Sequence, residues 1–372
     1  MDLPTAVHAP GRWFLPDLLK AVGCLLIVLH HLAFYGPMSD AVSLVWPRVI
    51  DWLYDHARLA VQVFLVVSGF LTAQALVPLP RLTGRQAMQR IVQRYLRLAL
   101  PLLAALSLTV LVSEVVRPTF DHDSLSAPPD WWQAWAHVFL LQHALDEEAL
   151  SAGVWYVAID LQLYVLSILI VWFLGRVRAG EQALQRVWLV LTLSSMVWWN
   201  RRPELDEWAL YFVAAYGMGV LAGLARARAS GPAGRTASVL LVMGLLAWAL
   251  EPRERLALAC AVALLLALVP QAWMQGPQGI WRVPIDRLAR MSYSVFVVHF
   301  GIGLAVNAVF SLWRPDQALI QGLGMAISLG LSLVAGGLLY GWVERPVPTG
   351  RRWAWLTGGF MASSALAIWL SA

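Results

Sequence analysis

The sequence predicts an all-α polytopic membrane protein, a bundle of about 10–11 transmembrane helices with a cytoplasmic N-terminus. Of its 372 residues, 59% are hydrophobic and only 13% are charged, whereas a soluble domain carries roughly 25% charged residues. Apolar runs of about 20 residues, the length that crosses a bilayer, recur along the whole chain. Charge also alternates between the segments that join these runs. Segment 81–97 holds five arginines and no acid, while segment 121–148 holds six acids and no Lys or Arg, which is the positive-inside pattern.

Eleven apolar runs are the expected spans. They lie at residues 15–36, 57–77, 96–116, 154–174, 187–199, 208–226, 236–250, 256–273, 293–313, 319–342 and 353–371. Two of them, 187–199 and 236–250, are shorter than the usual length and are the doubtful ones. The first run lacks a small-residue cleavage site and another run follows at once, so we expect a retained span and not a signal peptide. The longest connection, 117–153, is expected outside the membrane and has room for one interfacial helix.

The first run carries polar side chains that are costly in hydrocarbon. Lys20 and His31 are eleven positions apart, about 16 Å along a helix. An ammonium near the inner end suits an anionic ligand group, and an imidazole further along suits proton transfer. His30 lies about 100° around the helix from His31, so the two cannot face the same way. The alternative is that Lys20 extends to the membrane surface and the histidines bond neighbouring helices.

Later runs add further polar groups. Ser68 and the glycine after it allow close approach of another backbone or a ligand. Arg94 and Arg97 are three positions apart and share a helix face, so they can bind phosphate, although positive-inside flanking also explains them. Asp160 lies early in the run 154–174. We expect its carboxylate in the bundle interior, paired with a histidine or an arginine from another span, because an unpaired carboxylate there is too costly.

The remaining features are consistent with a membrane protein and with no nucleic-acid surface. The two cysteines, Cys24 and Cys260, fall in apolar runs, so free thiols are expected. Tryptophans at 131, 132 and 135 could stack on sugar rings or form an interfacial aromatic belt, and we favour the belt. The net charge of +5 follows from the topology.

The order and spacing of these groups resemble the acyltransferase-3 family of integral membrane acyltransferases, over nearly the whole chain. The matching motifs are, in chain order, Lys20 with His31, Ser68 to Leu71, Arg94 with Arg97, Trp155 with Asp160, Gln162 and Tyr164, Ser292 with Tyr293 and His299, and Glu344 with Arg345 and Pro346. The chain departs from the family where Asp160 replaces a glutamate, Leu161 replaces a second acid and Phe296 replaces a frequent tyrosine. The family usually has ten core spans. Residues 1–372 are therefore expected to form one domain, with a core at 12–346, an additional span at 353–371 and no fused hydrolase-like domain.

The resemblance implies a multi-pass O-acyltransferase of the cell inner membrane. Such enzymes move an acyl group, usually acetyl, from cytoplasmic acyl-coenzyme A to a hydroxyl of a cell-envelope or exported glycan or glycolipid. The implied catalytic residues are His31, as general base, and Asp160, and the implied donor site is Lys20, Arg94 and Arg97. The implied substrate contacts are Ser68, Trp155, Gln162, Tyr164 and His299.

The expected partners are acyl-coenzyme A, the acceptor and the lipid bilayer. No metal, no permanently bound cofactor and no nucleic acid are expected. The alternative function is a non-enzymatic transporter or glycan flippase. Such proteins carry inverted repeats and spans broken at matching positions, and the sequence shows neither.

Overall fold

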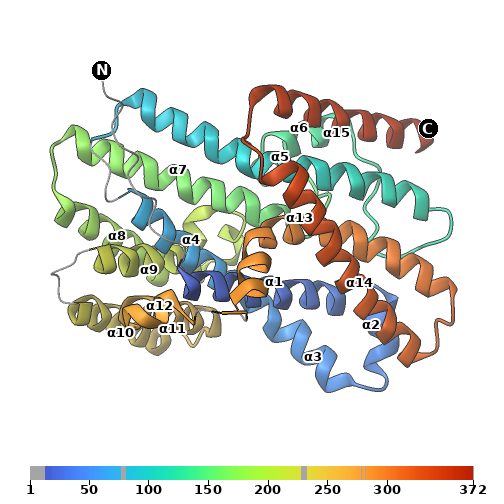
Figure 1. The fold of residues 1–372 in the computed structure, drawn as a ribbon, viewed down its shortest axis with the longest axis horizontal. Helices are drawn as coiled ribbons and strands as arrows, with labels where there is room; N and C mark the ends of the chain where they lie inside the picture. Colours follow the sequence, from blue (N-terminus) through green and yellow to red (C-terminus); the bar gives the residue numbers. More distant parts are fainter. Residues whose placement is uncertain (1–12, 77–80, 228–232, 278, 281, 372) are drawn as a thin grey trace.

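The chain folds into a bundle of helices (Figure 1). The computed structural model describes residues 13–76, 81–227, 233–277, 279–280 and 282–371, and these residues contain no β-strand. The helices are α1 (Phe14–Phe34), α2 (Pro37–Ser43), α3 (Pro47–His56), α4 (Ala60–Leu76), α5 (Gly84–Val116), α6 (Trp131–Val138), α7 (Val154–Arg176), α8 (Glu181–Val197), α9 (Ala209–Ala227), α10 (Ala233–Leu250), α11 (Glu254–Leu268), α12 (Gln271–Gln275), α13 (Arg282–Leu312), α14 (Ala318–Leu339) and α15 (Gly350–Ser371).

Each of the eleven expected spans coincides with one helix. Within the described residues, eight helical segments are long and apolar enough to cross a bilayer, and they contain α1, α4, α5, α7, α9, α13, α14 and α15. The other three helices, α8, α10 and α11, are shorter or less apolar, and they pack around α9. Helix α9 is buried along almost its whole length. The all-α polytopic fold is therefore confirmed, and the three shorter helices form a group with α9, in which α8 and α11 pack on α9 and α10 packs mainly on α11.

Two helices begin well before the apolar runs that predicted them. Helix α5 begins at Gly84, and helix α13 begins at Arg282. Hydropathy marks only the part of a helix that lies in hydrocarbon, whereas capping sets its first residue. In α5 the Thr83 side chain accepts a hydrogen bond from the Gln86 backbone N–H, and the Gln86 side chain accepts one from the Thr83 N–H. The arginine-rich segment is therefore part of one rigid helix of 33 residues.

The connection 117–153 contains one short helix, α6, as the sequence predicts. Asp130 caps this helix, and its side chain accepts a 2.7 Å hydrogen bond from a backbone N–H of the first turn. The side chains of Trp131, Trp132 and Trp135 are exposed on α6. They do not belong to the lining of either cavity described below. Their placement favours the aromatic belt over a direct contact with a substrate.

Helices α4 and α9 cross in direct backbone contact. Gly69 of α4 lies against the backbone carbonyl of Tyr216, and Gly219 of α9 lies against that of Val66. A Cβ at either glycine would overlap these carbonyl groups, so the crossing requires glycine. The contact also fixes the rotation of α4 about its axis, and Ser68, about 100° around the helix from Gly69, lines a cavity described below.

The additional span at the C-terminus is helix α15, which packs along α5 and against α6 (Figure 1). Its Trp353 side chain donates a 2.9 Å hydrogen bond from Nε1 to the hydroxyl of Tyr95 on α5. Helix α15 therefore supports the helix that carries the arginine pair. Cys24 and Cys260 are buried free thiols, which confirms that expectation.

Candidate active site

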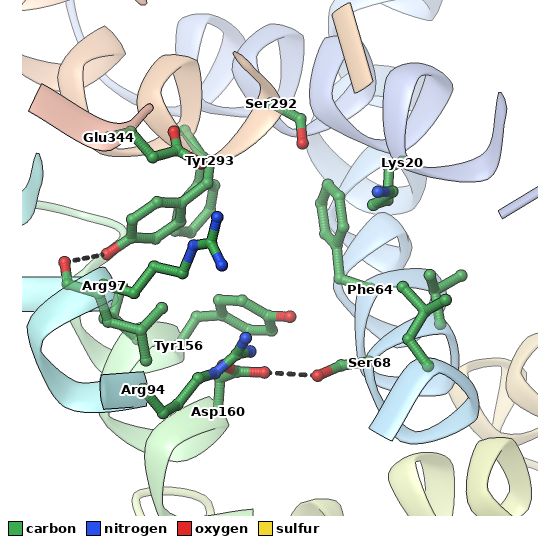
Figure 2. Close-up of a pocket in the computed structure, with 15 residues that line it drawn as sticks. Lys20, Phe64, Ser68, Arg94, Arg97, Tyr156, Asp160, Ser292, Tyr293 and Glu344 are labelled. Carbon is green, nitrogen blue, oxygen red and sulfur yellow. Dashed lines mark hydrogen bonds and ion pairs between the residues drawn. The ribbon is translucent and has the colours of Figure 1, made fainter. Parts of the chain in front are cut away.

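A cavity of about 230 Å³ lies between α1, α4, α5, α7, α13 and the end of α14 (Figure 2). The last turn of the α14 segment is a π-helical turn, Tyr340–Glu344, which brings Glu344 to the cavity wall; such turns occur frequently at functional sites. We call this space the arginine cavity. Its lining consists of Lys20, Phe64, Val67, Ser68, Leu71, Arg94, Arg97, Leu98, Tyr156, Val157, Asp160, Ser292, Tyr293, Phe296 and Glu344.

Asp160 is the centre of a hydrogen-bonded group on one wall of the arginine cavity. Its Oδ2 lies 2.5 Å from Nη2 of Arg94, and its Oδ1 accepts a 2.7 Å hydrogen bond from Oγ of Ser68 (Figure 2). Asp160 is buried on α7, while Arg94 belongs to α5. The expectation that Asp160 pairs in the interior with an arginine from another helix is therefore confirmed. This pairing removes the cost of an isolated carboxylate in an apolar bundle.

The other two cations of the arginine cavity differ in their partners. Nζ of Lys20 lies 2.8 Å from Oδ1 of Asp17, one turn earlier on α1. Within the described chain Arg97 forms no ion pair, and Figure 2 shows its guanidinium reaching into the open space beside Tyr293. On the same side Oε2 of Glu344 accepts a 2.6 Å hydrogen bond from a serine of α13. Arg97 is therefore the cation most available to an anionic ligand.

A second cavity, of about 730 Å³, lies at the other end of the same helices. Helices α1, α4, α7 and α13 contribute side chains to both cavities. We call the second space the His31 cavity. Its lining is strongly polar and includes His30, His31, Asp55, Arg58, Gln62, Asp123, Ser124, Ser126, Glu148, Ser151, Trp155, Arg253, Glu254 and Arg255.

His31 is hydrogen-bonded to a second histidine, His299 of α13. Nδ1 of His31 lies 2.6 Å from Nε2 of His299, and the two rings are parallel to within 2°. Nδ1 of the buried His299 lies 2.6 Å from the backbone carbonyl oxygen of Phe296. The neighbouring His30 faces another way, because its Nδ1 bonds the carbonyl oxygen of Leu53 at 3.2 Å.

The buried Arg253 lies between α10 and α11 and lines the His31 cavity. Nη1 of Arg253 donates to Oδ1 of Asn200 and Nη2 donates to the carbonyl oxygen of Met196, both at 2.8 Å. Burial lowers the pKa of Arg253, and the nearby Glu251 carboxylate opposes that shift. The guanidinium stays charged, so it fixes this wall through short, directional bonds.

Three aromatic rings mark the boundary between the two cavities. The rings of Phe64, Tyr156 and Phe296 come from α4, α7 and α13, and their centroids lie 5.5–6.4 Å apart. All three line the arginine cavity, whereas nearby residues of the same helices, such as Gln62 and Trp155, line the His31 cavity. We call Phe64, Tyr156 and Phe296 the ring layer. Any group passing between the cavities along these helices has to cross it.

The structure divides the expected site residues between the two cavities. Asp160 and His31, the two expected catalytic residues, line different cavities, and no hydrogen bond joins them in the described chain. The arginine cavity holds Lys20, Ser68, Arg94, Arg97 and Asp160, and the His31 cavity holds His31 and Trp155. Asp160 thus belongs to the arginine cavity, where it bonds Arg94 and Ser68, and His31 belongs to the other cavity.

Three residues expected to contact substrate, Gln162, Tyr164 and His299, line neither of these cavities, and His299 instead bonds His31. Oε1 of Gln162 accepts a 3.1 Å hydrogen bond from the backbone N–H of Ala209, at the first residue of α9. The ring of Tyr164 lies 5.3 Å from the guanidinium carbon of Arg94, a cation–π distance. The structure therefore gives Gln162 a helix-capping role and makes Tyr164 a support for Arg94.

Sequence reasoning missed Asp17 and Tyr156. Asp17 lies three positions before Lys20, the spacing of neighbouring residues on a helix face, and this spacing was the available signal. Tyr156 directly follows Trp155, but the two rings face different cavities. Such a division cannot be seen before the helices are packed.

The acyltransferase-3 family model, described as an acyltransferase domain, matches residues 15–336. No curated protein and no solved structure matches the chain. In the described residues, no group of three or more His, Cys, Asp or Glu side chains is placed to hold a metal ion. The matched region covers most of the chain and includes all four helices that line both cavities, so the chain belongs to the acyltransferase-3 family and is a multi-pass membrane acyltransferase.

Proposed function

We propose that the protein transfers an acyl group from acyl-coenzyme A in the arginine cavity to a hydroxyl of an acceptor in the His31 cavity. One observation carries this proposal: a cationic cavity and a histidine-bearing cavity lie end to end on the same four helices, with the ring layer between them. The positive-inside pattern of the sequence supports a cytoplasmic position for the arginine cavity, on the side where acyl-coenzyme A is available. The protein then works in the cell inner membrane with its N-terminus inside.

The donor fits the arginine cavity by charge and by length. Arg97 has no ion-pair partner in the described chain and binds a coenzyme A phosphate, with Lys20 on the opposite wall of the cavity. Lys20 and His31 lie eleven positions apart on α1, about 16 Å. An extended pantetheine arm spans such a distance, so its thioester reaches the ring layer while the phosphates stay at the cations.

The chemistry is a general-base acyl transfer. His31 takes the proton of the acceptor hydroxyl as its oxygen attacks the thioester carbonyl. A C–O bond forms, the C–S bond breaks, and the proton on His31 is finally passed to the departing thiolate. Base catalysis of this kind contributes about 10²–10⁴-fold to the rate. The products are the acylated acceptor and coenzyme A.

The acceptor fits the His31 cavity by polarity. Trp155 offers a flat apolar face, and carboxylates, arginines and serines surround it. A sugar presents many hydroxyl groups next to apolar ring faces, so we infer that the acceptor is a cell-envelope glycan or glycolipid. The acyl group has to cross the ring layer, and acetyl, with only two carbons, is the acyl group that we propose.

The decisive experiment measures donor binding separately from transfer. Purified protein in detergent is heated with acetyl-coenzyme A, and a specific ligand at 100 times its Kd stabilises the folded state by about 2.7 kcal/mol. We expect Arg97→Ala to weaken donor affinity by about tenfold or more, as expected for the loss of a charge-assisted hydrogen bond. The matched control is Arg85→Ala, on the same helix but exposed and outside the cavity.

Two outcomes would contradict this donor site and favour the alternative function, a glycan flippase. Wild-type protein with no affinity for acyl-coenzyme A, or equal affinity in the Arg97→Ala and Arg85→Ala variants, contradicts the donor assignment. Transport of a glycan lipid without acylation in proteoliposomes would then favour the flippase.

A further inference from the structure

We propose that His299 is a positioning residue that holds His31 in the tautomer with a proton on Nδ1 and a free lone pair on Nε2. The tautomer follows from the hydrogen bonds of two neutral imidazoles and does not depend on the reaction. Its consequence for catalysis rests on the proposed function, in which His31 is the general base.

The chain of bonds starts at a backbone carbonyl. The Phe296 carbonyl oxygen can only accept, so the 2.6 Å contact with Nδ1 of His299 requires the proton on that nitrogen. A neutral His299 then has a lone pair on Nε2. The 2.6 Å contact between this Nε2 and Nδ1 of His31 therefore requires the proton on Nδ1 of His31. The remaining nitrogen of His31, Nε2, is left with its lone pair.

That lone pair faces open space. Nε2 of His31 makes no hydrogen bond in the described chain, and it is not among the buried polar atoms that lack a partner. His31 lines the His31 cavity, so Nε2 is the atom that an acceptor hydroxyl can reach. The parallel rings and the burial of His299 hold this orientation. An imidazole is thereby fixed in both its tautomer and its direction.

The arrangement does the work that a carboxylate does in a His–carboxylate pair. No carboxylate is hydrogen-bonded to His31 among the described residues. When Nε2 takes the hydroxyl proton, the Nδ1–H bond to His299 strengthens, and the positive charge spreads toward the Phe296 carbonyl. The polar groups facing His31 itself are His30, Tyr35 and His299. A neutral partner supplies the orientation without a buried negative charge.

The kinetic test compares two substitutions of His299. In His299→Leu the acceptor for Nδ1–H is lost, and we expect kcat to fall by on the order of 100-fold. In His299→Gln the side-chain oxygen can accept that proton, so kcat should stay within about tenfold of wild type. The KM values for donor and acceptor should be unchanged in both. The control is His137→Gln, a buried histidine of α6 outside both cavities, which should transfer at the wild-type rate.

Equal losses in the Leu and Gln variants, or a loss confined to the acceptor KM, would overturn the positioning role. A second measurement needs no activity. The ¹⁵N chemical shifts of histidine side chains in solid-state NMR distinguish the two neutral tautomers, and the His31→Ala spectrum assigns the His31 signals. We expect the Nδ1–H form in wild type and the Nε2–H form in His299→Leu. A wild-type His31 with its proton on Nε2 would contradict the inference, whether or not the protein uses acyl-coenzyme A.

Discussion

Asp160 carries a charge in the interior of the bundle, and Arg94 and Ser68 compensate it. We expect Asp160→Asn to destabilise the fold by about 2 kcal/mol, because it leaves the Arg94 charge without its partner. This figure is below the 3–5 kcal/mol typical of fully buried pairs, since the Arg94 side chain is 30% exposed. Adding Arg94→Gln should restore part of the loss. The double-mutant cycle compares the free energies of unfolding, in a denaturing detergent, of Asp160→Asn, Arg94→Gln and the double variant. Additive losses would show that the pair contributes no coupling energy.

Substitution of the adjacent histidines of α1, His30 and His31, should affect the transfer rate very differently. His31→Ala removes the proposed base, so we expect transfer to be lost while donor affinity and expression stay near wild type, since the donor is bound at the other end. His30 is bonded to the Leu53 carbonyl, and His30→Ala should reduce transfer by less than about tenfold. Single-turnover transfer rates and donor Kd values check both. An active His31→Ala with an inactive His30→Ala would move the base to His30.

The crossing of α4 and α9 should depend on glycine. In Gly219→Ala the new Cβ meets the Val66 carbonyl, so the helices must separate, and we expect a loss of 1–3 kcal/mol, about the cost of overpacking. Gly359 of α15 is the control, because a Cβ there meets nothing within 4 Å. Gly359→Ala should be neutral or stabilising by up to about 1 kcal/mol. Thermal unfolding measures the stability of both variants. Equal stability would show that the crossing tolerates a methyl group at Gly219.

The loop 117–153 should loosen in acid through His137. Nδ1 of His137 donates to the Gln133 carbonyl at 2.8 Å, and Nε2 accepts from the Leu150 N–H at 3.1 Å. Burial lowers the pKa of His137 to about 4, whereas an unfolded histidine titrates near 6.5. The unfolded loop therefore binds more protons between these values, and its stability falls as pH drops from about 6.5 to 4, by up to about 1.4 kcal/mol per pH unit.

Hydrogen exchange of the Leu150 amide, corrected for its intrinsic pH dependence, measures this loosening. The His137→Gln variant is the control, since glutamine can make both bonds but does not titrate. Equal pH dependence in the two proteins would assign the effect to other groups of the loop.

At the scale of the whole molecule, the sequence predicted the fold well and the site in part. Apolar length is a local property, so each of the eleven expected spans coincides with a helix, and eight helical segments of the described chain are long and apolar enough to cross a bilayer. The pairing of Asp160 was predictable because a lone carboxylate cannot remain in a membrane bundle. The division of residues between two cavities was not predictable, because it depends on helix rotation. Gln162 shows this, since its place in a site motif gave no sign that it caps α9.

The ring layer should also keep donor and acceptor apart until both are bound. Phe296→Ala removes one of its three rings and joins the two cavities. We expect faster hydrolysis of acyl-coenzyme A without acceptor, because water then reaches the thioester. Phe310→Ala, a buried ring of the same helix outside both cavities, is the control and should not hydrolyse the donor. Release of free coenzyme A thiol reports the rate, and hydrolysis at the wild-type rate in Phe296→Ala would exclude a barrier role.

Two polar cavities that approach each other along the same helices also change where the membrane voltage falls. Hydrocarbon spreads the voltage over about 30 Å, but hydrated cavities conduct it inward, so most of the drop is concentrated across the ring layer. A unit charge crossing there gains or loses about 2.3 kcal/mol per 100 mV. In the proposed reaction a proton moves inward from the acceptor to the thiolate, while the acyl group, formally an acylium cation, moves outward to the acceptor oxygen, so no net charge crosses the ring layer. The extent of transfer in sealed vesicles should therefore be the same with and without an imposed potential, because the thioester alone drives the reaction.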